Sequence, residues 1–271
     1  MFVNLKSVRR GLFLASLLVA AIALVGCGRG GSGTITVAGS TTVQPLAQKL
    51  AEAFMDGNPS VRIDVQGGGT SVGIQACNDG TVDIGAASRE LKDSEPALVK
   101  HLLARDGIAI VTNSRNTVNG LTKDQVKKIF AGSITKWSEV GGANERIGVY
   151  AREEGSGTRG AFEELVMGSD HITSDAVLQN SNGFLRTAVA GDANAVGFLS
   201  FGYVDSSVKT LAIDGVAAAV ADVKSGSYPI ARPLYLLTKQ EPTEDVKEYI
   251  NFCLGAEGQK LVEEEGYISA L

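Results

Sequence analysis

Strand-like and helix-like segments alternate along most of this sequence, and that alternation limits the fold more than any other feature. β-prone runs lie at residues 34–37, 61–65, 82–84, 107–112, 147–150, 195–201 and 230–237. Helical patterns lie between and after them, at residues 46–54, 74–79, 94–104, 123–130 and 243–265. Strands that alternate with helices usually form mostly parallel sheets with helices on their faces. The sequence therefore predicts an α/β fold.

The N-terminus has the pattern of a lipoprotein signal peptide. Three basic residues precede an apolar run at residues 11–25, which ends in Leu-Val-Gly-Cys at Cys27. That run has the length of a signal-peptide core and is short for a membrane span, although a short anchor with a chance cysteine is the alternative. We expect residues 1–26 to be removed, and residues 27–33 to be a lipidated cysteine and a flexible tether. The body of the chain is then exported, lipid-anchored to a membrane, and periplasmic or on the cell surface.

The charge and the metal-binding residue types exclude several classes of function. Removing residues 1–26 removes three positive charges and no negative ones, which takes the formal net charge from −5 to about −8. Such a chain has no basic stripe for nucleic acid. The two histidines and the two cysteines of the body, Cys77 and Cys253, lack the spacing of metal ligands, so we expect no metal and no cofactor. Two buried free thiols are favoured over a disulfide.

Three predicted strand-to-helix turns share one composition, glycine followed by hydroxyl residues. They are Gly39-Ser-Thr-Thr42, Gly69-Thr-Ser71 and Gly155-Ser-Gly-Thr158. The first N–H groups of a helix have no partner within the helix, and the helix dipole adds partial positive charge there. Each turn alone is explained by ordinary N-capping. Three of them in one α/β chain indicate an anion site at which they converge.

Arg152 lies just ahead of the third turn and is the candidate for a fixed positive charge in that site. A guanidinium group can bind two oxygen atoms of a tetrahedral oxyanion. The alternative is a surface arginine paired with Glu154, and both roles are compatible. The arginine and the turn would together form one wall of the anion site.

Seven segments in this order resemble the phosphate-binding lipoproteins of bacterial phosphate ABC transporters: AGSTTVQPLA, VQGGGTSVGIQ, VDIGAASRELK, KIFAGSITKWSEV, REEGSGTRGAFEE, NGFLRTAVAGDANAVGFLS and YPIARPLYLLTK. The resemblance implies a two-lobed clamshell of the periplasmic-binding-protein type, in which each lobe is a mostly parallel sheet flanked by helices. It implies two hinge crossovers, near residues 110–114 and 229–233. Lobe 1 would then comprise residues 34–111 and 232–271, and lobe 2 residues 112–231.

The same resemblance transfers a set of ligand-binding positions. Arginine and Ser-Gly-Thr donors come from lobe 2, and hydroxyl groups from two turns of lobe 1. The implied phosphate-binding residues are Ser40, Thr41, Thr42, Thr70, Ser71, Ser88, Arg152, Ser156, Gly157 and Thr158. We expect no catalytic residue.

One position departs from the family pattern. Well-studied members carry an aspartate after the strand that reads DIGA, and that carboxylate accepts the proton of hydrogen phosphate. Here the position is Ser88 or, with a one-residue gap, Arg89. A serine hydroxyl repels sulfate much less than a carboxylate does, so selectivity for phosphate is the open part of the prediction.

The sequence thus predicts a binding protein that captures inorganic phosphate with high affinity and delivers it to permease subunits of an ABC transporter, as a monomer and without enzymatic activity. A binding protein for tungstate, molybdate or sulfate is the alternative. A distant alternative is an exported serine hydrolase, because Gly69-Thr-Ser71-Val-Gly73 fits G-x-S-x-G and His171 lies downstream.

Overall fold

The computed structural model describes residues 33–271 of the chain. The signal peptide at residues 1–26, the lipidation of Cys27 and nearly all of the tether at 27–33 are predictions that lie outside the described residues. Within residues 33–271, no helix combines the length and the apolar character that crossing a membrane requires.

Ten strands form one mixed sheet in the order β2-β1-β3-β11-β4-β8-β6-β7, with β9 and β12 also pairing with β4. Two short strands, β5 and β10, pair separately. The strands are β1 (Thr34–Gly39), β2 (Arg62–Gln66), β3 (Ile84–Ala87), β4 (Val99–Asn113), β5 (Gly120–Leu121), β6 (Gly148–Arg152), β7 (Val177–Gln179), β8 (Ala195–Ser200), β9 (Val208–Thr210), β10 (Ala212–Ile213), β11 (Ala231–Thr238) and β12 (Ile268–Ser269).

The two ends of the sheet are parallel and its centre is antiparallel. β1 pairs in parallel with β2 and β3, and β6 pairs in parallel with β7 and β8. β11 runs antiparallel to β3 and β4, and β4 runs antiparallel to β8. The predicted α/β class is confirmed, with two antiparallel strands inserted where the two lobes join.

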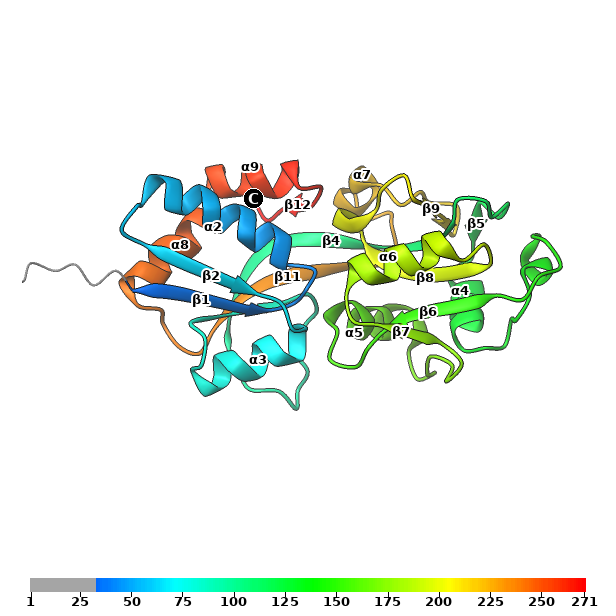
Figure 1. The fold of residues 1–271 in the computed structure, drawn as a ribbon, viewed down its shortest axis with the longest axis horizontal. Helices are drawn as coiled ribbons and strands as arrows, with labels where there is room; N and C mark the ends of the chain where they lie inside the picture. Colours follow the sequence, from blue (N-terminus) through cyan, green and yellow to red (C-terminus); the bar gives the residue numbers. More distant parts are fainter. Residues whose placement is uncertain (1–32) are drawn as a thin grey trace, which may run out of the picture. The chain divides into compact units, whose positions relative to one another are not determined.

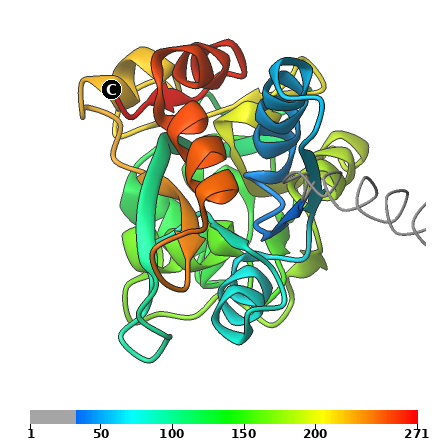
Figure 2. The ribbon, with the colours of Figure 1, turned by 90° about the vertical axis from the view of Figure 1, so that its left-hand side faces the viewer.

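Lobe 1 packs helices on both faces of β1, β2 and β3. The helices are α2 (Gln44–Gly57), α3 (Thr70–Asp79), α8 (Glu244–Leu254) and α9 (Ala256–Glu264). α2, α8 and α9 lie on one side of the strands and α3 lies on the other (Figures 1 and 2). The core combines residues from both ends of the chain, among them Leu46, Leu50, Leu234 and Tyr249. The predicted helical region at 243–265 is confirmed as two helices that meet at Gly255.

Lobe 2 is built on β6, β7 and β8. Its helices are α4 (Lys123–Phe130), α5 (Gly157–Phe162), α6 (Asn182–Gly191) and α7 (Val220–Lys224), with a π-helical continuation of α5 at Glu163–Met167 and short 3₁₀ turns at Trp137–Val140 and Phe201–Tyr203. Three aromatic rings pack together in the core of lobe 2. Phe162 stacks on Phe198 with ring centroids 4.3 Å apart, and Phe130 contacts both.

β4 runs from one lobe into the other. Its residues up to Gly107 pair with β11 in lobe 1, and its residues from Ile108 onward pair with β8 in lobe 2. The predicted helix at 94–104 is wrong, because β4 already begins at Val99. The leucine, alanine and lysine content of that stretch favours a helix, but pairing with β11 and β12 overrides this local preference.

Cys77 and Cys253 are both buried and unpaired, as the sequence favoured. Cys77 lies between α3 and β11, where its Sγ donates to the Leu237 carbonyl at 3.3 Å. Burial raises the pKa of the Cys253 thiol to about 12. Both cysteines therefore act as small apolar groups of the lobe 1 core.

Candidate functional site

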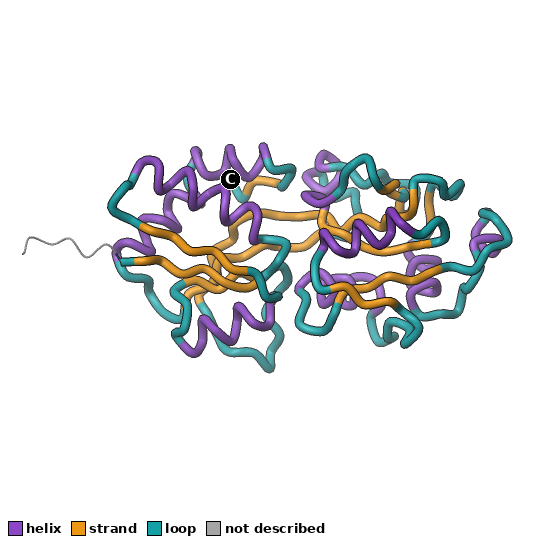
Figure 3. Tube along the Cα trace, viewed as in Figure 1, coloured by secondary structure: helices purple, strands orange, loops and turns teal. Residues whose placement is uncertain are grey.

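The three glycine-hydroxyl turns lie at the carboxyl ends of β1, β2 and β6, where each leads into a helix. The ends of β1 and β2 point from lobe 1 toward the loops that precede α5 and α6 in lobe 2 (Figure 3). Gly69 lies so close to Gly155 that a side chain at position 69 would contact the Gly155 carbonyl. The fold therefore brings the three turns together, as the sequence predicted.

The lobe 1 hydroxyls form a buried, hydrogen-bonded group around Ser88. Ser40 Oγ donates to Ser88 Oγ at 2.9 Å, and Thr70 Oγ1 lies 3.4 Å from it. The Ser88 backbone N–H donates to Thr70 Oγ1 at 3.1 Å. Ser40 Oγ also accepts from the backbone N–H groups of Thr42 and Val43. Its donor and acceptor capacity is therefore used inside lobe 1.

The lobe 2 turn supplies a capped helix start. Ser156 is the N-cap of α5, and its Oγ accepts from the Arg159 backbone N–H at 3.3 Å. Gly157 and Thr158 follow in the first turn, and both are buried. A methyl group at Gly157 would overlap Thr70 Oγ1 and Ser88 Oγ. Only glycine lets the α5 N-terminus approach the lobe 1 hydroxyls this closely.

Arg152 ends β6 and is only 1% exposed. Its Nε and Nη2 donate to the Glu153 carboxylate at 3.0 and 2.9 Å, and to the carbonyls of Gln179 and Asn180. The alternative, a surface arginine paired with Glu154, is wrong, because Arg152 is buried and its carboxylate partner is Glu153. Residues two positions apart share a face only while the strand continues. β6 ends at Arg152 and a turn begins at Glu154, which lines a surface pocket instead. Arg152 Nη1 has no hydrogen-bond partner among the described residues.

Three contacts join the lobes at these turns. Thr42 Oγ1 lies 3.0 Å from Thr158 Oγ1, and Arg152 Nη2 donates to Thr41 Oγ1 at 3.2 Å. The Ser71 backbone N–H donates to the Gly155 carbonyl at 3.1 Å. The described arrangement thus corresponds to lobes that are closed on each other.

Ser88 and Arg89, the two alternatives at the position that departs from the family pattern, have different environments. Ser88 lies inside the hydroxyl group described above. Arg89 turns away from it and donates to both oxygen atoms of Glu95, at 2.6 and 2.7 Å. Burial is the largest single influence on Glu95 and acts to raise its pKa. The hydrogen bonds from Arg89 and from the Lys92 backbone N–H, together with the charges of both residues, outweigh burial and hold the pKa below its usual value.

Sequence reasoning missed a group of buried polar residues that contacts these hydroxyls from behind. Arg232 on β11 donates to Asp106 Oδ2 on β4 through Nη2 at 2.7 Å and Nε at 3.0 Å. Its Nη1 donates to the Ser88 carbonyl at 3.0 Å and reaches Ser88 Oγ at 3.4 Å. Its Nη2 also lies 3.4 Å from Thr42 Oγ1. Burial raises the pKa of the Asp106 carboxyl against the effect of Arg232.

Other missed residues hold the Thr41-Thr42 turn. Asn182, at the start of α6, donates from Nδ2 to Thr42 Oγ1 at 2.8 Å. Tyr203 donates to the Thr41 carbonyl at 2.6 Å, and Tyr267 donates to the Thr42 carbonyl at 3.1 Å. Arg232 stands in a strand that is otherwise apolar, and an arginine in a buried strand requires a partner. That was the one available signal in the sequence.

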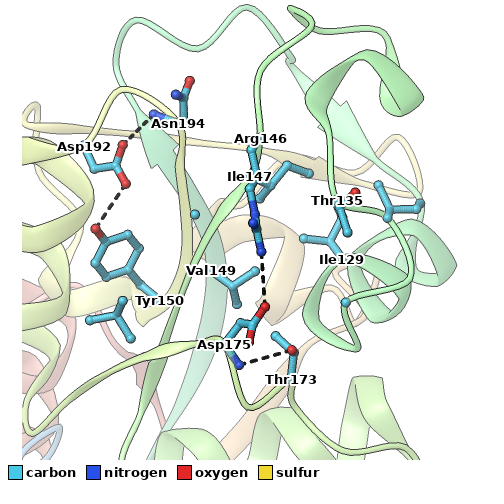
Figure 4. Close-up of a pocket in the computed structure, with 14 residues that line it drawn as sticks. Ile129, Thr135, Arg146, Ile147, Val149, Tyr150, Thr173, Asp175, Asp192 and Asn194 are labelled. Atoms are coloured by element: carbon cyan, nitrogen blue, oxygen red, sulfur yellow. Dashed lines mark hydrogen bonds and ion pairs between the residues drawn. The ribbon is translucent and has the colours of Figure 1, made fainter.

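A polar pocket of about 340 Å³ adjoins the site at the junction of the lobes. Ser71 and Ser156 line it, together with Arg89 and Arg159. A different pocket of about 390 Å³ lies in lobe 2 and contains none of the predicted residues; its rim carries the pairs Arg146–Asp175 and Tyr150–Asp192 (Figure 4). Its lining mixes aliphatic and polar side chains, and its three charged side chains all take part in those two pairs.

The hydrolase hypothesis has no geometric support. Ser71 and His171 line the same pocket, but within residues 33–271 no hydrogen bond joins them. Ser71 Oγ accepts instead from Arg89 Nη2 at 3.2 Å. A serine nucleophile needs a base within hydrogen-bond reach. The same described residues contain no cluster of metal-ligating side chains.

Comparisons with known proteins agree with this geometry. The model of the PBP superfamily domain matches residues 28–257. The phosphate-binding protein PstS of Bacillus subtilis is 35% identical over 243 residues, which cover 88% of this chain and 81% of that protein.

Two solved structures share the fold. One is a Clostridium perfringens substrate-binding protein assigned to phosphate ABC transport, with bound phosphate; it is 40% identical, has a TM-score of 0.86, and the match covers 88% of this chain and all of that one. The other is an ABC-type phosphate transport receptor from Vibrio cholerae, with 37% identity, a TM-score of 0.75, and 86% and 99% coverage. This chain therefore belongs to the PBP superfamily and, within it, to the family of the phosphate-binding proteins PstS.

Proposed function

We propose that this chain binds inorganic phosphate with high affinity outside the cytoplasmic membrane and delivers it to the permease subunits of an ABC transporter. Its family is one of transport proteins, and the relatives and solved structures above are named for phosphate. The converging turns, the buried hydroxyls and Arg152 supply the donors that a tetrahedral oxyanion requires.

The observation that carries this proposal is the unpartnered Nη1 of Arg152. A buried N–H group without a partner costs about 1–3 kcal/mol, and more on a charged group. The same guanidinium lies next to the Thr41 hydroxyl, and the neighbouring Thr42 contacts Thr158 in the first turn of α5. An oxyanion placed between them satisfies Nη1 and receives further donors from both lobes.

The ten predicted ligand residues divide into direct and indirect contributors in this proposal. Arg152, Gly157 N–H and the hydroxyls of Thr41, Thr70, Ser156 and Thr158 are the direct donors. Ser40 fixes the position of Ser88, and Ser71 lines the adjoining pocket. Thr42 and Ser88 each keep one hydroxyl proton that can reach the anion or a neighbouring hydroxyl.

Capture requires the lobes to open and close about the two crossovers, near residues 110–114 and 229–233. The proposed division assigns residues 34–111 and 232–271 to lobe 1, and residues 112–231 to lobe 2. We further propose a lipid anchor on Cys27, a monomeric state and a location in the periplasm or on the cell surface. These follow from the N-terminal sequence pattern and from the family.

The test is a calorimetric titration of the ligand-stripped protein, residues 28–271, with phosphate, sulfate, molybdate and tungstate. Stripping by unfolding and refolding removes anion that survives purification. Phosphate binding in the micromolar range or tighter supports the proposal. Tighter binding of molybdate or tungstate than of phosphate would keep the site and overturn the ligand. No heat with any of the four anions would overturn the binding function itself.

A further inference from the structure

Two tyrosines from opposite lobes hold the Thr41-Thr42 turn, and their contacts carry an inference that rests on the proposed phosphate binding and deepens it. We propose that Tyr203 is a positioning residue whose hydroxyl fastens lobe 2 to the Thr41 carbonyl when the lobes close, and that this contact sets how slowly the bound anion is released. Its hydroxyl is committed to a protein carbonyl, so it acts on release without being a ligand.

The Tyr203 contact crosses from one lobe to the other. Tyr203 belongs to the short turn Phe201–Tyr203, which follows β8 in lobe 2. Its hydroxyl donates to the Thr41 carbonyl of lobe 1 at 2.6 Å. Burial raises the pKa of Tyr203 against the opposing effect of Arg152 and Arg186. The hydroxyl therefore keeps its proton at neutral pH, which a bond to a carbonyl requires, because a carbonyl can only accept.

The backbone around Tyr203 is fixed on lobe 2 and on the crossover strand. Arg186 of α6 donates from Nη1 to the Tyr203 carbonyl at 3.1 Å and pairs with Asp205 at 3.0 Å. The Phe201 backbone N–H donates to Asp106 Oδ1 on β4 at 3.2 Å. A tyrosine anchored in this way moves with lobe 2 when the lobes separate.

Thr41 is held from lobe 2 at two points. Its Oγ1 accepts from Arg152 Nη2 at 3.2 Å, and its carbonyl accepts from Tyr203. In the proposed site Arg152 and Thr41 are donors from opposite lobes, so release of the anion requires them to separate, and Thr41 then leaves Tyr203 as well. The Tyr203 bond therefore belongs to the closed form. Its loss should speed opening and leave the encounter of the anion with the open form unchanged.

Tyr267 provides a contact to the same turn from within lobe 1. It lies in the lobe 1 core, and its hydroxyl donates to the Thr42 carbonyl at 3.1 Å. A methyl group on Gly202 would overlap the Tyr267 hydroxyl, so the Phe201–Tyr203 turn packs directly against this tyrosine. Tyr267 moves with Thr42 in both forms, whereas Tyr203 reaches the turn only when the lobes are closed.

The experiment compares three tyrosine-to-phenylalanine variants of the ligand-stripped protein, residues 28–271. Tyr203→Phe removes the contact between the lobes, and Tyr267→Phe removes the contact to the same turn from lobe 1. Tyr249→Phe is the matched control. The buried Tyr249 hydroxyl also donates to a backbone carbonyl, that of Ala47 at 3.2 Å, but both residues belong to the lobe 1 core.

Two measurements separate the rates of release and association. Calorimetry gives the phosphate dissociation constant. Displacement of radiolabelled phosphate by excess unlabelled phosphate, in a rapid-mixing instrument, gives the release rate. The ratio of the release rate to the dissociation constant is the association rate. Melting curves confirm that each variant is folded.

Tyr203→Phe is expected to raise the release rate about three- to tenfold, the effect of losing one hydrogen bond, and to leave the association rate within about twofold of the wild type. Tyr267→Phe should raise the release rate less, and Tyr249→Phe should leave both rates unchanged. These results would support the inference.

Slower association with unchanged release in Tyr203→Phe would reduce Tyr203 to shaping the turn and would overturn the inference. An effect no larger than that of Tyr249→Phe, or release that is equally fast in Tyr267→Phe, would overturn it as well. A wild type that does not bind phosphate would instead contradict the proposed function, and with it this inference.

Discussion

Arg152 and Arg232 are both almost completely buried, at 1% and 3% exposure, yet they use their nitrogen atoms differently. Arg152, in the lobe 2 turn, leaves Nη1 without a partner. Arg232, on the crossover strand, pairs every nitrogen with Asp106, Ser88 or Thr42. The first arginine keeps a donor for an incoming group, and the second organises the protein around it. Burial alone therefore does not distinguish the two arginines, and the unsatisfied donor of Arg152 is what supports its proposed role in binding.

The largest expected effect comes from Gly157→Ala, which should keep the Arg152 turn of lobe 2 apart from the hydroxyls of lobe 1. The added methyl group overlaps the hydroxyls of Thr70 and Ser88, so the lobes cannot close and Arg152 cannot reach the lobe 1 donors. Losing two or more charge-assisted contacts, at about 1.5–3 kcal/mol each, should weaken phosphate binding by at least a hundredfold. Calorimetry measures this. Gly191→Ala is the matched control, because Gly191 has open space around it, and it should bind as the wild type does.

Asp106→Leu changes only the crossover strands, where Asp106 on β4 pairs with Arg232 on β11. It leaves Arg232 as a buried charge without its carboxylate, which should lower the free energy of unfolding by about 3–5 kcal/mol. Urea denaturation measures the change. The double variant with Arg232→Met should recover more than half of that loss. A single variant as stable as the wild type would show that the pair does not hold the crossover.

Arg152→Ala changes only the proposed anion-binding turn of lobe 2. One lost charge-assisted contact in a closed site costs about 1.5–3 kcal/mol, so the phosphate dissociation constant should rise more than tenfold. The free energy of unfolding without ligand should fall by less than it does in Asp106→Leu. Unchanged phosphate affinity would remove Arg152 from the site.

The smallest effect concerns a third buried arginine, Arg89, whose two terminal nitrogen atoms both donate to Glu95. The lowered pKa of Glu95 means that its pair with Arg89 stabilises the folded protein above the unfolded-state pKa, near 4.5. That contribution is lost as the pH falls through the lower folded-state pKa. Glu95→Gln should cost at most about 1 kcal/mol at pH 7 and should flatten the acid side of the stability profile. Denaturation curves from pH 3 to pH 7 test this, and an unchanged acid side would exclude the pair as its cause.

The parts of the site that the sequence predicts are those that are local along the chain. Glycine and hydroxyl residues at a strand-to-helix turn mark Ser40, Thr70 and Ser156 without any knowledge of tertiary structure. The alternation of β-prone and helical patterns gives the α/β class in the same way. These signals depend only on neighbouring residues and on helix capping.

The parts that sequence reasoning missed depend on distant pairing. Arg232 and Asp106 are 126 residues apart, and Arg232 and Thr42 are 190 residues apart. The helix wrongly expected at 94–104 fails for the same reason, because β11 supplies the pairing that makes Val99 onward a strand. Glu154, the alternative partner of Arg152, would share a face with it only if the strand continued, but β6 ends at Arg152 and the guanidinium pairs with Glu153.

The core of lobe 1 takes residues from both ends of the sequence, and this has a consequence for the order in which the chain can acquire structure. Leu46 and Leu50 near one end pack with Leu234, Tyr249 and Tyr267 near the other. The lobe 2 core lies almost entirely between Ile108 and Ile230. A chain that emerges from the ribosome or a translocation pore N-terminus first therefore has every lobe 2 strand available before lobe 1 can close its core. The last 40 residues complete the core of lobe 1, and the anion site cannot assemble before they have been released.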